Sequence, residues 1–395
     1  MDEPSGTDGP QPTGSGGRLS RRRFVAVAGV VGAGALAGCP ASTGDGGDGG
    51  GADDPTDLAN FRGSGPLVET RGQPGGTSIT ELPDLSGELT LYLGGGEGGL
   101  YMDLIELFGN VYPEFDVSTQ LEASANLANT IVEESEAGTS PADVFMAVDA
   151  GSLGAVAEAG AAASLPSEAT DAVPAELRTD EWVGFAGRAR AIPYNTEQLS
   201  GPDVPETVQE FPEFGAFEES FGWAPTYSAF QSFVTAMRLT RGADETRDWL
   251  LDMRDLGAIE YNNEFLASNA VADGEIAGAL ANHYYALRVR NSRGDAPVDL
   301  AFTSGDAGAL INVSGATIIE GTDDEELAVD FLRHLLSAEA QEFFATRTFA
   351  YPTVPGVEPV GGLPSIDELN PPDVDLAELA NVDPTLELLR ETDVL

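Results

Sequence analysis

The sequence contains no lysine and very little cysteine or histidine, and these absences exclude several classes of chemistry. All 19 basic residues are arginine, the one cysteine is Cys39, and the two histidines are His283 and His334. Without lysine there is no phosphate-loop lysine, no Schiff-base lysine and no Ser-x-x-Lys pair. A single cysteine excludes an internal disulfide and a cysteine metal cluster. Two histidines leave little for zinc or triad chemistry.

Positive charge is scarce compared with negative charge. The 395 residues include 66 acidic and 19 basic side chains, for a net charge of -47, and the acids are spread along the chain. Molar salt shortens the screening length to about 3 Å, so such a surface tolerates its own repulsion in brine. We interpret the balance as adaptation to saturating salt, as in a haloarchaeal protein. It argues against nucleic acid as a partner.

The N-terminal region has the pattern of an export signal. Ser20–Phe24 is a basic patch, an apolar run follows, and small residues precede Cys39. The paired arginines resemble a twin-arginine motif, and Leu36–Cys39 resembles a lipobox in which Cys39 is lipidated. We therefore expect residues 1–38 to be a lipoprotein signal and the protein to be anchored to the outer face of the membrane. An uncleaved anchor helix with an incidental cysteine is the alternative.

After the signal, residues 39–86 are rich in Gly, Asp, Thr, Ser and Pro without apolar periodicity, which predicts a flexible tether. From about residue 87, strand and helix patterns alternate, which favours an α/β fold with an open, mostly parallel sheet. The expected strands include 89–93, 115–120, 182–185 and 190–195, and the expected helices include 100–108, 126–137 and 229–239.

Six residues, 94–99, form a glycine run between the first strand and the first helix. The run satisfies the G-x-G-x-x-G pattern of dinucleotide sites, but poly-glycine does so in several registers. The export signal places the protein where dinucleotides are scarce. The competing interpretation is a loop around Gly96 whose backbone N–H groups line a ligand cleft at a helix N-terminus.

Three tyrosines stand out in the second half of the chain. Tyr284 and Tyr285 are adjacent, and Tyr227 comes just before the helical pattern that Ser228 is expected to cap. On a strand, adjacent side chains point to opposite faces, but at a helix start both phenols can turn toward one point. The alternative is a pair of half-buried core aromatics. We expect the neighbouring His283 to face away from the pair.

Four segments carry a resemblance to a known family. Residues 87–355 resemble the iron(III)-binding proteins of ABC importers, within the extracellular solute-binding proteins. The resemblance implies a two-lobed, periplasmic-binding-protein-like (type II) fold with a two-strand hinge and an interlobe ligand cleft. It places the first lobe at 87–190 plus about 300–345 and the second at 191–299 plus about 346–395. The segments are Ser140–Gly151, Trp182–Asn195, Gly222–Phe230 and Asn282–Arg288, with Gly308–Gly315 as a weaker fifth.

The resemblance also implies a ligand set. Tyr284 and Tyr285 match the paired tyrosines that bind Fe3+ as phenolates, and Tyr227 matches a third tyrosine found in a subset of the family. The histidine of other members falls on Gly96 and their glutamate falls near Val148. The sequence therefore resembles the tyrosine-rich class, in which a carbonate-like anion or water completes the coordination.

Several residues are expected around these tyrosines. An anion can lie against the helix N-terminus at Ser228, with Arg188 and Arg190 as candidate partners. For Arg188, a structural ion pair is an equal alternative. Asn282 is expected either to hydrogen-bond a phenolate or an anion, or to be a turn residue. Asp149 is expected to cap a helix.

Together these features predict a monomeric, non-enzymatic protein that passes iron, free or as a small ferric chelate, to an ABC permease and its ATPase. Because the second lobe supplies all three tyrosines, we expect iron to bind the open form and the first lobe to close over it. One alternative keeps the fold and changes the ligand to an organic anion, a phosphonate or a polyamine. Another is an extracellular enzyme or a surface-structural protein.

Overall fold

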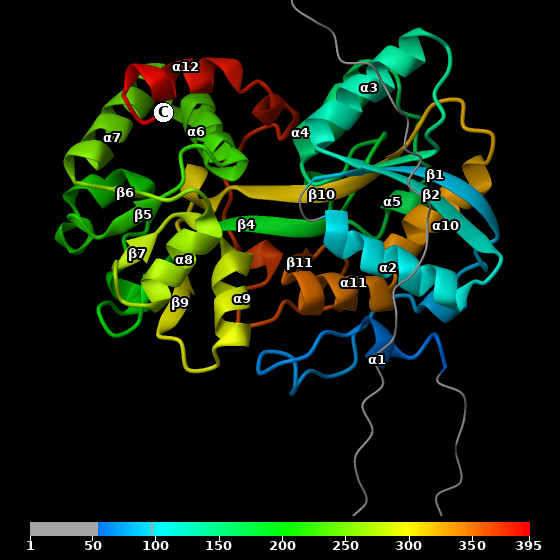
Figure 1. Cartoon of the computed structure of the whole chain (residues 1–395), viewed down its shortest axis with the longest axis horizontal. Helices are drawn as coiled ribbons and strands as arrows, with labels where there is room; N and C mark the ends of the chain where they lie inside the picture. Colours follow the sequence, from blue (N-terminus) through cyan, green and yellow to red (C-terminus); the bar gives the residue numbers. More distant parts are fainter. Residues whose placement is uncertain (1–53, 96–97) are drawn as a thin grey trace, which may run out of the picture. The chain divides into compact units, whose positions relative to one another are not determined.

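The computed structural model describes residues 54–95 and 98–395 (Figure 1). The predicted signal at 1–38, Cys39 and Gly96 lie outside these residues. Among the helices of the described ranges, none is both long enough and apolar enough to cross a membrane.

The described residues form one mixed sheet, with helices packed around it. The strands are β1 (Gly87–Gly94), β2 (Phe115–Glu122), β3 (Val144–Ala147), β4 (Val183–Asn195), β5 (Phe221–Trp223), β6 (Ile259–Glu260), β7 (Gly278–Ala279), β8 (Ala281–Asn282), β9 (Val298–Ala301), β10 (Ile311–Ile318) and β11 (Tyr351–Pro352). The α-helices are α1 (Leu58–Phe61), α2 (Gly98–Val111), α3 (Ser124–Glu136), α4 (Ala150–Glu158), α5 (Ser167–Thr170), α6 (Ser228–Arg241), α7 (Ala243–Asp255), α8 (Glu264–Ala272), α9 (His283–Ser292), α10 (Glu325–Leu335), α11 (Ala338–Phe343) and α12 (Asp383–Glu391).

The strand order is β2-β1-β3-β10-β4-β7-β5-β6, and it divides the described chain into two lobes. In the first lobe β1 pairs in parallel with β2 and β3, as the alternating pattern predicts. In the second lobe β5 pairs in parallel with β6 and β7. Each lobe has its own hydrophobic core: Phe108, Phe145 and Phe185 are buried in the first, and Phe217, Phe233 and Trp249 in the second.

Strand β4 links the two lobes, and β10 runs antiparallel beside it (Figure 1). The first half of β4 pairs with β10 and β11, and its second half pairs with β7, β8 and β9. The sequence predicts two short strands here, at 182–185 and 190–195, because the intervening residues Ala186–Ala189 include no large apolar side chain. The two are one strand of 13 residues, since β10 and β11 supply partners along the intervening stretch.

The segment 54–86, predicted as part of a flexible tether, is instead folded onto the first lobe. Arg62 and Arg71 from this segment both pair with the buried carboxylate of Glu342, at 2.7 and 2.8 Å. The few buried apolar residues of this segment are widely spaced in the sequence and therefore give no periodic signal. Their packing partners lie far along the chain, so composition alone mispredicts the segment. Its most buried apolar residues are Phe61, Ile79 and Leu85.

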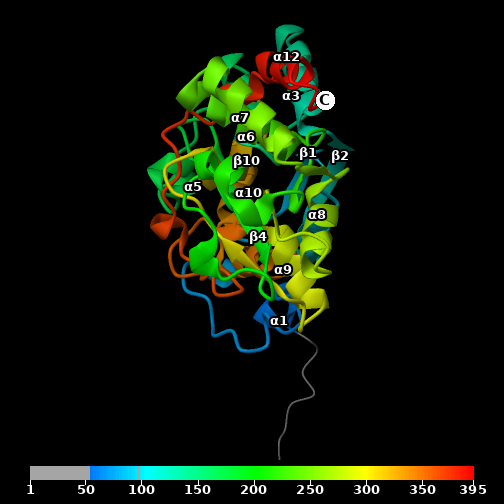
Figure 2. The ribbon, with the colours of Figure 1, turned by 90° about the vertical axis from the view of Figure 1, so that its left-hand side faces the viewer.

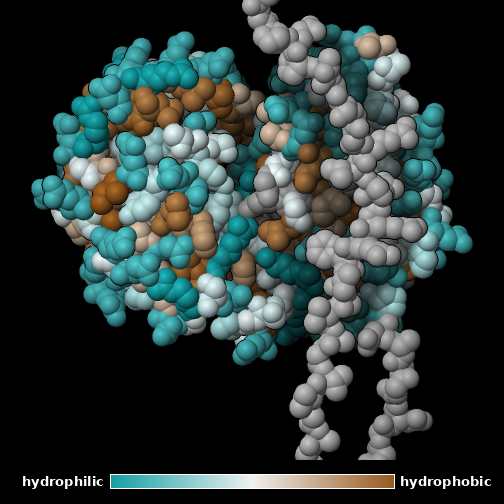
Figure 3. All heavy atoms as spheres, in the orientation of Figure 1, coloured by the Kyte–Doolittle hydropathy of each residue, from teal (hydrophilic) through white to brown (hydrophobic). Residues whose placement is uncertain are grey.

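Helices α8 and α9 lie side by side on one face of the second lobe (Figures 1 and 2). On the face of the molecule shown in Figure 3, hydrophilic residues form most of the outer edges. Helix α9 begins immediately after the short strand β8, which pairs with β4 at Arg190 and Ala191. The strand pairing therefore fixes where the first turn of α9 starts.

Candidate functional site

Three tyrosines meet at the edge of the second lobe. Tyr284 and Tyr285 lie in the first turn of α9, and their ring centroids are 4.4 Å apart. Tyr227 is the residue before α6, its ring centroid lies 6.3 Å from that of Tyr285, and the two hydroxyl groups share a hydrogen bond. A helix start thus brings the adjacent phenols and Tyr227 to one place, which we call the tyrosine cluster.

Two of these tyrosines are buried. The exposed fraction is 2% for Tyr284 and 7% for Tyr285. Burial raises the pKa of the Tyr285 phenol far above its ordinary value, and the neighbouring Tyr284 and Tyr227 raise it further. Such a phenol stays neutral by itself, and a bound cation reverses that preference by stabilising the phenolate. The cluster is chemically suited to a highly charged metal ion.

One arginine in contact with the cluster was not singled out from the sequence. The guanidinium carbon of Arg288 lies 4.8 Å from the ring centroid of Tyr284 and 5.4 Å from that of Tyr285. Arg288 comes four residues after Tyr284 and three after Tyr285, and residues at these spacings are neighbours on a helix surface. This spacing is the sequence signal that indicates the contact. A cation over the rings interacts favourably with their π electrons.

Asn282, the residue before α9, connects the cluster to β4. Its Nδ2 donates to the hydroxyl of Tyr284 at 3.1 Å, and its Oδ1 accepts from Nη1 of Arg190 at 3.2 Å. Of the two expected roles, hydrogen bonding to a phenol is the one that the geometry provides. Arg190 is 2% exposed and also forms an ion pair with Glu264.

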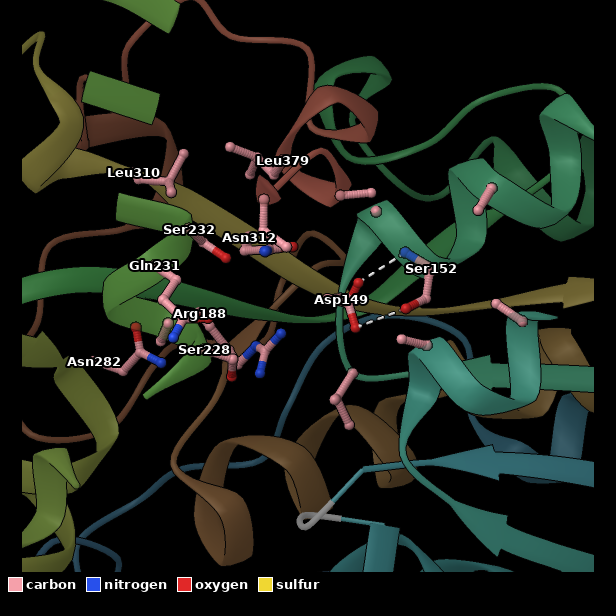
Figure 4. A pocket seen from close by; sticks show the side chains of 18 of the residues that line it. Asp149, Ser152, Arg188, Ser228, Gln231, Ser232, Asn282, Leu310, Asn312 and Leu379 are labelled. Carbon is pink, nitrogen blue, oxygen red and sulfur yellow. Dashed lines mark hydrogen bonds between the residues drawn. The ribbon is translucent and has the colours of Figure 1, made fainter. Parts of the chain in front are cut away.

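A cavity of about 510 Å³ lies between the two lobes, and its lining includes Ser228, which follows Tyr227, and Asn282, which bonds Tyr284, but none of the three tyrosines. Arg188, Ser228 and Asn282 lie together on one side of it, and Ser152 of α4 lies opposite with Asp149, the residue that precedes this helix (Figure 4). The C-terminal segment forms a further wall of the cavity, through Leu379, Ala380 and Val382. The cavity is thus lined by cationic and amide groups from the second lobe and β4, and by α3 and α4 of the first lobe.

Ser228 is the first residue of α6 rather than its cap. The cap position belongs to Tyr227, whose side chain makes no capping bond, so the prediction of Ser228 as N-cap is wrong by one residue. Ser228 and Ala229 both line the cavity. A helix N-terminus carries a partial positive charge, so this position favours an anion in the cavity.

His283 is structural, as expected from the sequence. The ring is fully buried, Nδ1 lies 3.2 Å from the backbone nitrogen of Ala189, and Nε2 lies 2.8 Å from the carbonyl oxygen of Phe349. Burial lowers its pKa to about 4, so the ring is neutral near pH 7. Asp149 likewise caps α4, because its carboxylate accepts from the backbone of Ser152 at 2.7 Å.

The glycine run at the end of β1 has a packing explanation in its first two residues. A Cβ on Gly94 would lie 2.2 Å from Oγ of Ser124, and Gly95 has φ +82 with Val148 beside it. Val148, where the family's glutamate would fall, lines the cavity. In the residues 54–95 and 98–395, no group of three or more His, Cys, Asp or Glu side chains is placed to hold a metal ion.

The fold and the cavity define a class: a two-lobed α/β protein that binds a ligand between its lobes. Residues 105–368 match the model of the family described as bacterial extracellular solute-binding protein. The match covers more than half of the chain, and the protein belongs to this family.

Among its curated relatives, the major ferric iron-binding protein of Neisseria meningitidis is 29% identical over 273 residues, which are 67% of this chain and 81% of the relative. Iron uptake protein A2 of Synechocystis is 30% identical over 263 residues, covering 62% of this chain and 75% of the relative. Among solved structures, iron-bound HitA from Pseudomonas aeruginosa is 29% identical with a TM-score of 0.67, covering 77% of this chain and 99% of HitA. The Trichodesmium protein IdiA (FutA), solved with iron and citrate, is 25% identical with a TM-score of 0.64, covering 78% and 99%.

Proposed function

We propose that the protein is the extracytoplasmic solute-binding component of an ABC importer, and that it binds Fe3+ through the phenolates of Tyr227, Tyr284 and Tyr285. The observation that carries this proposal is the convergence of the three phenols beside the interlobe cavity. Fe3+ is a small, hard cation that prefers anionic oxygen ligands, and three phenolates balance its charge. A bound metal ion supplies the energy that deprotonates buried phenols.

The relatives support this ligand, because the proteins from Neisseria meningitidis and Pseudomonas aeruginosa carry iron in their names or titles. The site proposed here belongs to the tyrosine-rich class. Val148 presents an apolar side chain to the cavity, and the described residues hold no group of three or more His, Cys, Asp or Glu side chains placed to bind a metal ion.

A carbonate-like anion completes the coordination in this proposal. Arg188 and Arg190 line the cavity together with Ser228 and Asn282. Within the described chain, Nε and Nη2 of the buried Arg190 side chain have no hydrogen-bond partner. Unsatisfied buried donors are costly, and an anion in the cavity would satisfy them.

The cellular setting follows from the N-terminal pattern. We propose that the protein is exported through the twin-arginine motif and lipidated at Cys39. It then functions as a monomer on the outer face of the cell membrane of a salt-adapted cell, where it passes iron to the permease and its ATPase. The first lobe then closes over iron held by the second lobe. Part of the segment 346–395, which the sequence predicts for the second lobe, packs in the core of the first instead, with Tyr351, Val354 and Val357 buried there. The acidic composition, with a net charge of -47, supports the salt adaptation.

The size of the cavity favours a second candidate. About 510 Å³ lined by two arginines and three asparagines suits an organic anion, free or as a ferric chelate, better than it suits a bare ion. In that case the protein would bind an organic anion or a phosphonate, with the tyrosines as packing residues. A polyamine fits poorly beside two arginines.

Titration with Fe3+ tests the proposal. Phenolate-to-iron charge transfer should give a visible absorption band that saturates at one equivalent, and Tyr284→Phe with Tyr285→Phe should abolish it. Tyr112→Phe is the matched control, because Tyr112 is 7% exposed like Tyr285 but donates to the carbonyl of Ile79 in the first lobe. A colourless wild-type protein that binds an organic anion would favour the second candidate.

A further inference from the structure

A buried chain of polar groups leads from α8 to the tyrosine cluster. Glu264 is the first residue of α8 and is fully buried. Its Oε1 accepts from Nη1 of Arg190, and its Oε2 accepts from the backbone N–H of Asn282 at 2.8 Å. A carboxylate at this depth is tolerated only when donors replace its lost water, and both of its oxygens have such donors here.

The chain fixes the orientation of the Asn282 amide. Arginine can only donate hydrogen bonds, so the amide oxygen of Asn282 must face Nη1 of Arg190, at 3.2 Å. The amide nitrogen then has to face the hydroxyl of Tyr284, at 3.1 Å. Glu264 holds Arg190 in place and also binds the Asn282 backbone. It therefore decides which end of the amide meets the phenol.

We propose that Glu264 is a positioning residue for the metal-binding phenolate of Tyr284, acting through Arg190 and Asn282. The inference rests on the proposed iron-binding function. An N–H donor directed at a metal-bound phenolate stabilises its negative charge and fixes the direction of its oxygen. Groups that orient a ligand in this way typically contribute 10- to 100-fold, roughly, to metal affinity. They also tune the electronic transition between the ligand and the metal.

The primary test is the isosteric variant Glu264→Gln. One arm of the new amide is a donor, so it cannot accept from Arg190 and from the Asn282 backbone in the same way. We expect iron affinity to fall about 10- to 100-fold. The charge-transfer band should also move to longer wavelength, because a phenolate that loses its N–H donor releases its electron more easily.

Glu342→Gln is the matched control. The Glu342 side chain is 1% exposed and pairs with Arg62 and Arg71, so it is as buried and as charged as Glu264. Its partners lie in the N-terminal segment 54–86. We expect this variant to lose thermal stability while its band wavelength and iron affinity stay at the wild-type values. The comparison separates positioning of the tyrosine from a general loss of a buried ion pair.

Two further measurements keep the inference testable whatever the fate of Glu264→Gln. Asn282→Asp replaces the donor nitrogen by an oxygen with Glu264 intact, and its band should also lie at longer wavelength. In the metal-free protein, hydrogen exchange of the Asn282 side-chain amide, followed by NMR, should be slow in the wild type and fast in Glu264→Gln. The exchange experiment needs no iron.

The outcomes distinguish this inference from the proposed function. If Glu264→Gln has the same band wavelength and iron affinity as the wild type, and its Asn282 side-chain amide still exchanges slowly, the positioning role alone would be overturned. If Glu264→Gln does not fold, an Asn282→Asp band at the wild-type wavelength would overturn it. A wild-type protein without any charge-transfer band would overturn the proposed function and this inference together.

Discussion

Tyr92 and Tyr112 of the first lobe are as buried as Tyr285 of the second, but their hydroxyl groups have different hydrogen-bond partners. In the first lobe, Tyr92 donates to Glu134 at 3.0 Å and Tyr112 donates to the carbonyl of Ile79 at 3.2 Å. In the second lobe, the hydroxyl of Tyr285 instead meets that of Tyr227. Tyr92 and Tyr112 thus each have an acceptor outside the tyrosines, whereas Tyr227 and Tyr285 share a hydrogen between two oxygens that a cation could bind. The partner of the hydroxyl, and not the burial of the ring, therefore distinguishes Tyr285 of the proposed site from Tyr92 and Tyr112.

The contribution of each lobe to the cavity differs in the same way. The second lobe and β4 supply the arginines, the amide of Asn282 and the N-terminus of α6, behind which the tyrosine cluster lies, while the first lobe supplies α3 and α4, with Asp149 and Ser152 bonded to each other. We infer that the second lobe is the binding half and the first lobe the closing half. Substitutions in the first lobe should therefore change stability without changing the iron band, whereas substitutions of the tyrosines in the second lobe should change the band.

The largest effect expected at the junction of the lobes is the pH dependence due to His283. Its pKa is about 4 in the folded protein and near 6.5 when unfolded, so the unfolded state binds the extra proton. Stability is therefore complete above pH 6.5 and falls as the pH drops toward 4, by about 3 kcal/mol for this group.

The measurement is chemical denaturation at pH 7 and pH 4.5 in constant high salt, comparing the wild type with His283→Gln. Acidification protonates many carboxylates in both proteins, so the difference between their losses of unfolding free energy gives the contribution of the histidine. The wild type should lose more stability than the variant. Equal losses would show that the His283 ring does not stay neutral in the folded state.

A smaller effect is expected where the C-terminal segment bridges the lobes. The short helix η9 (Ala377–Ala380) packs on α4 of the first lobe, and its Leu379 is buried in the core of the second. A Cβ on Gly154 of α4 would lie 2.8 Å from the Cβ of Ala377. Gly154→Ala should therefore cost about 1–3 kcal/mol through overpacking.

Gly109→Ala is the control for that variant. Gly109 lies in α2, where an added Cβ meets no atom within 4 Å. The same substitution there should stabilise the protein by about 0.5–1 kcal/mol through helix propensity. Denaturation midpoints of both variants test the bridge, and a stabilised Gly154→Ala would mean that η9 is not held against α4.

The smallest effect concerns the helix cap in the closing half. Asp149→Ala removes the carboxylate that accepts from the backbone of Ser152, at a cost of about 1 kcal/mol. Asp149→Asn keeps an acceptor and should keep most of that stability. Neither variant should change the wavelength of the iron band, since Asp149 lies across the cavity from the tyrosines. A shifted band would show that the first lobe takes part in ligation.

The fold and part of the site were predictable from the sequence. The alternating pattern after residue 87 predicts the parallel strands, and the adjacency of Tyr284 and Tyr285 allows the two phenols to converge if the pair lies at a helix start. These signals are local, because a strand or a helix start is specified by neighbouring residues. The ordering of 54–86 was missed for the opposite reason, since Arg62 and Glu342 are 280 residues apart.

Glu264 was missed for a similar reason. In the sequence it is one of 66 acidic residues, and nothing near it indicates burial. Its role depends on β8 pairing with β4, which brings Asn282 and Arg190 together. Arg288 differs, because its spacing from Tyr284 on α9 was readable and was not used.

The most direct test of the account is the visible spectrum at one equivalent of Fe3+ for two single variants, one from each lobe. Tyr227→Phe removes a phenol of the cluster, and Tyr112→Phe removes a core phenol of the first lobe. The account predicts a weaker, displaced charge-transfer band for Tyr227→Phe and a wild-type band for Tyr112→Phe. A Tyr227→Phe spectrum identical to that of the wild type would contradict the three-phenolate site.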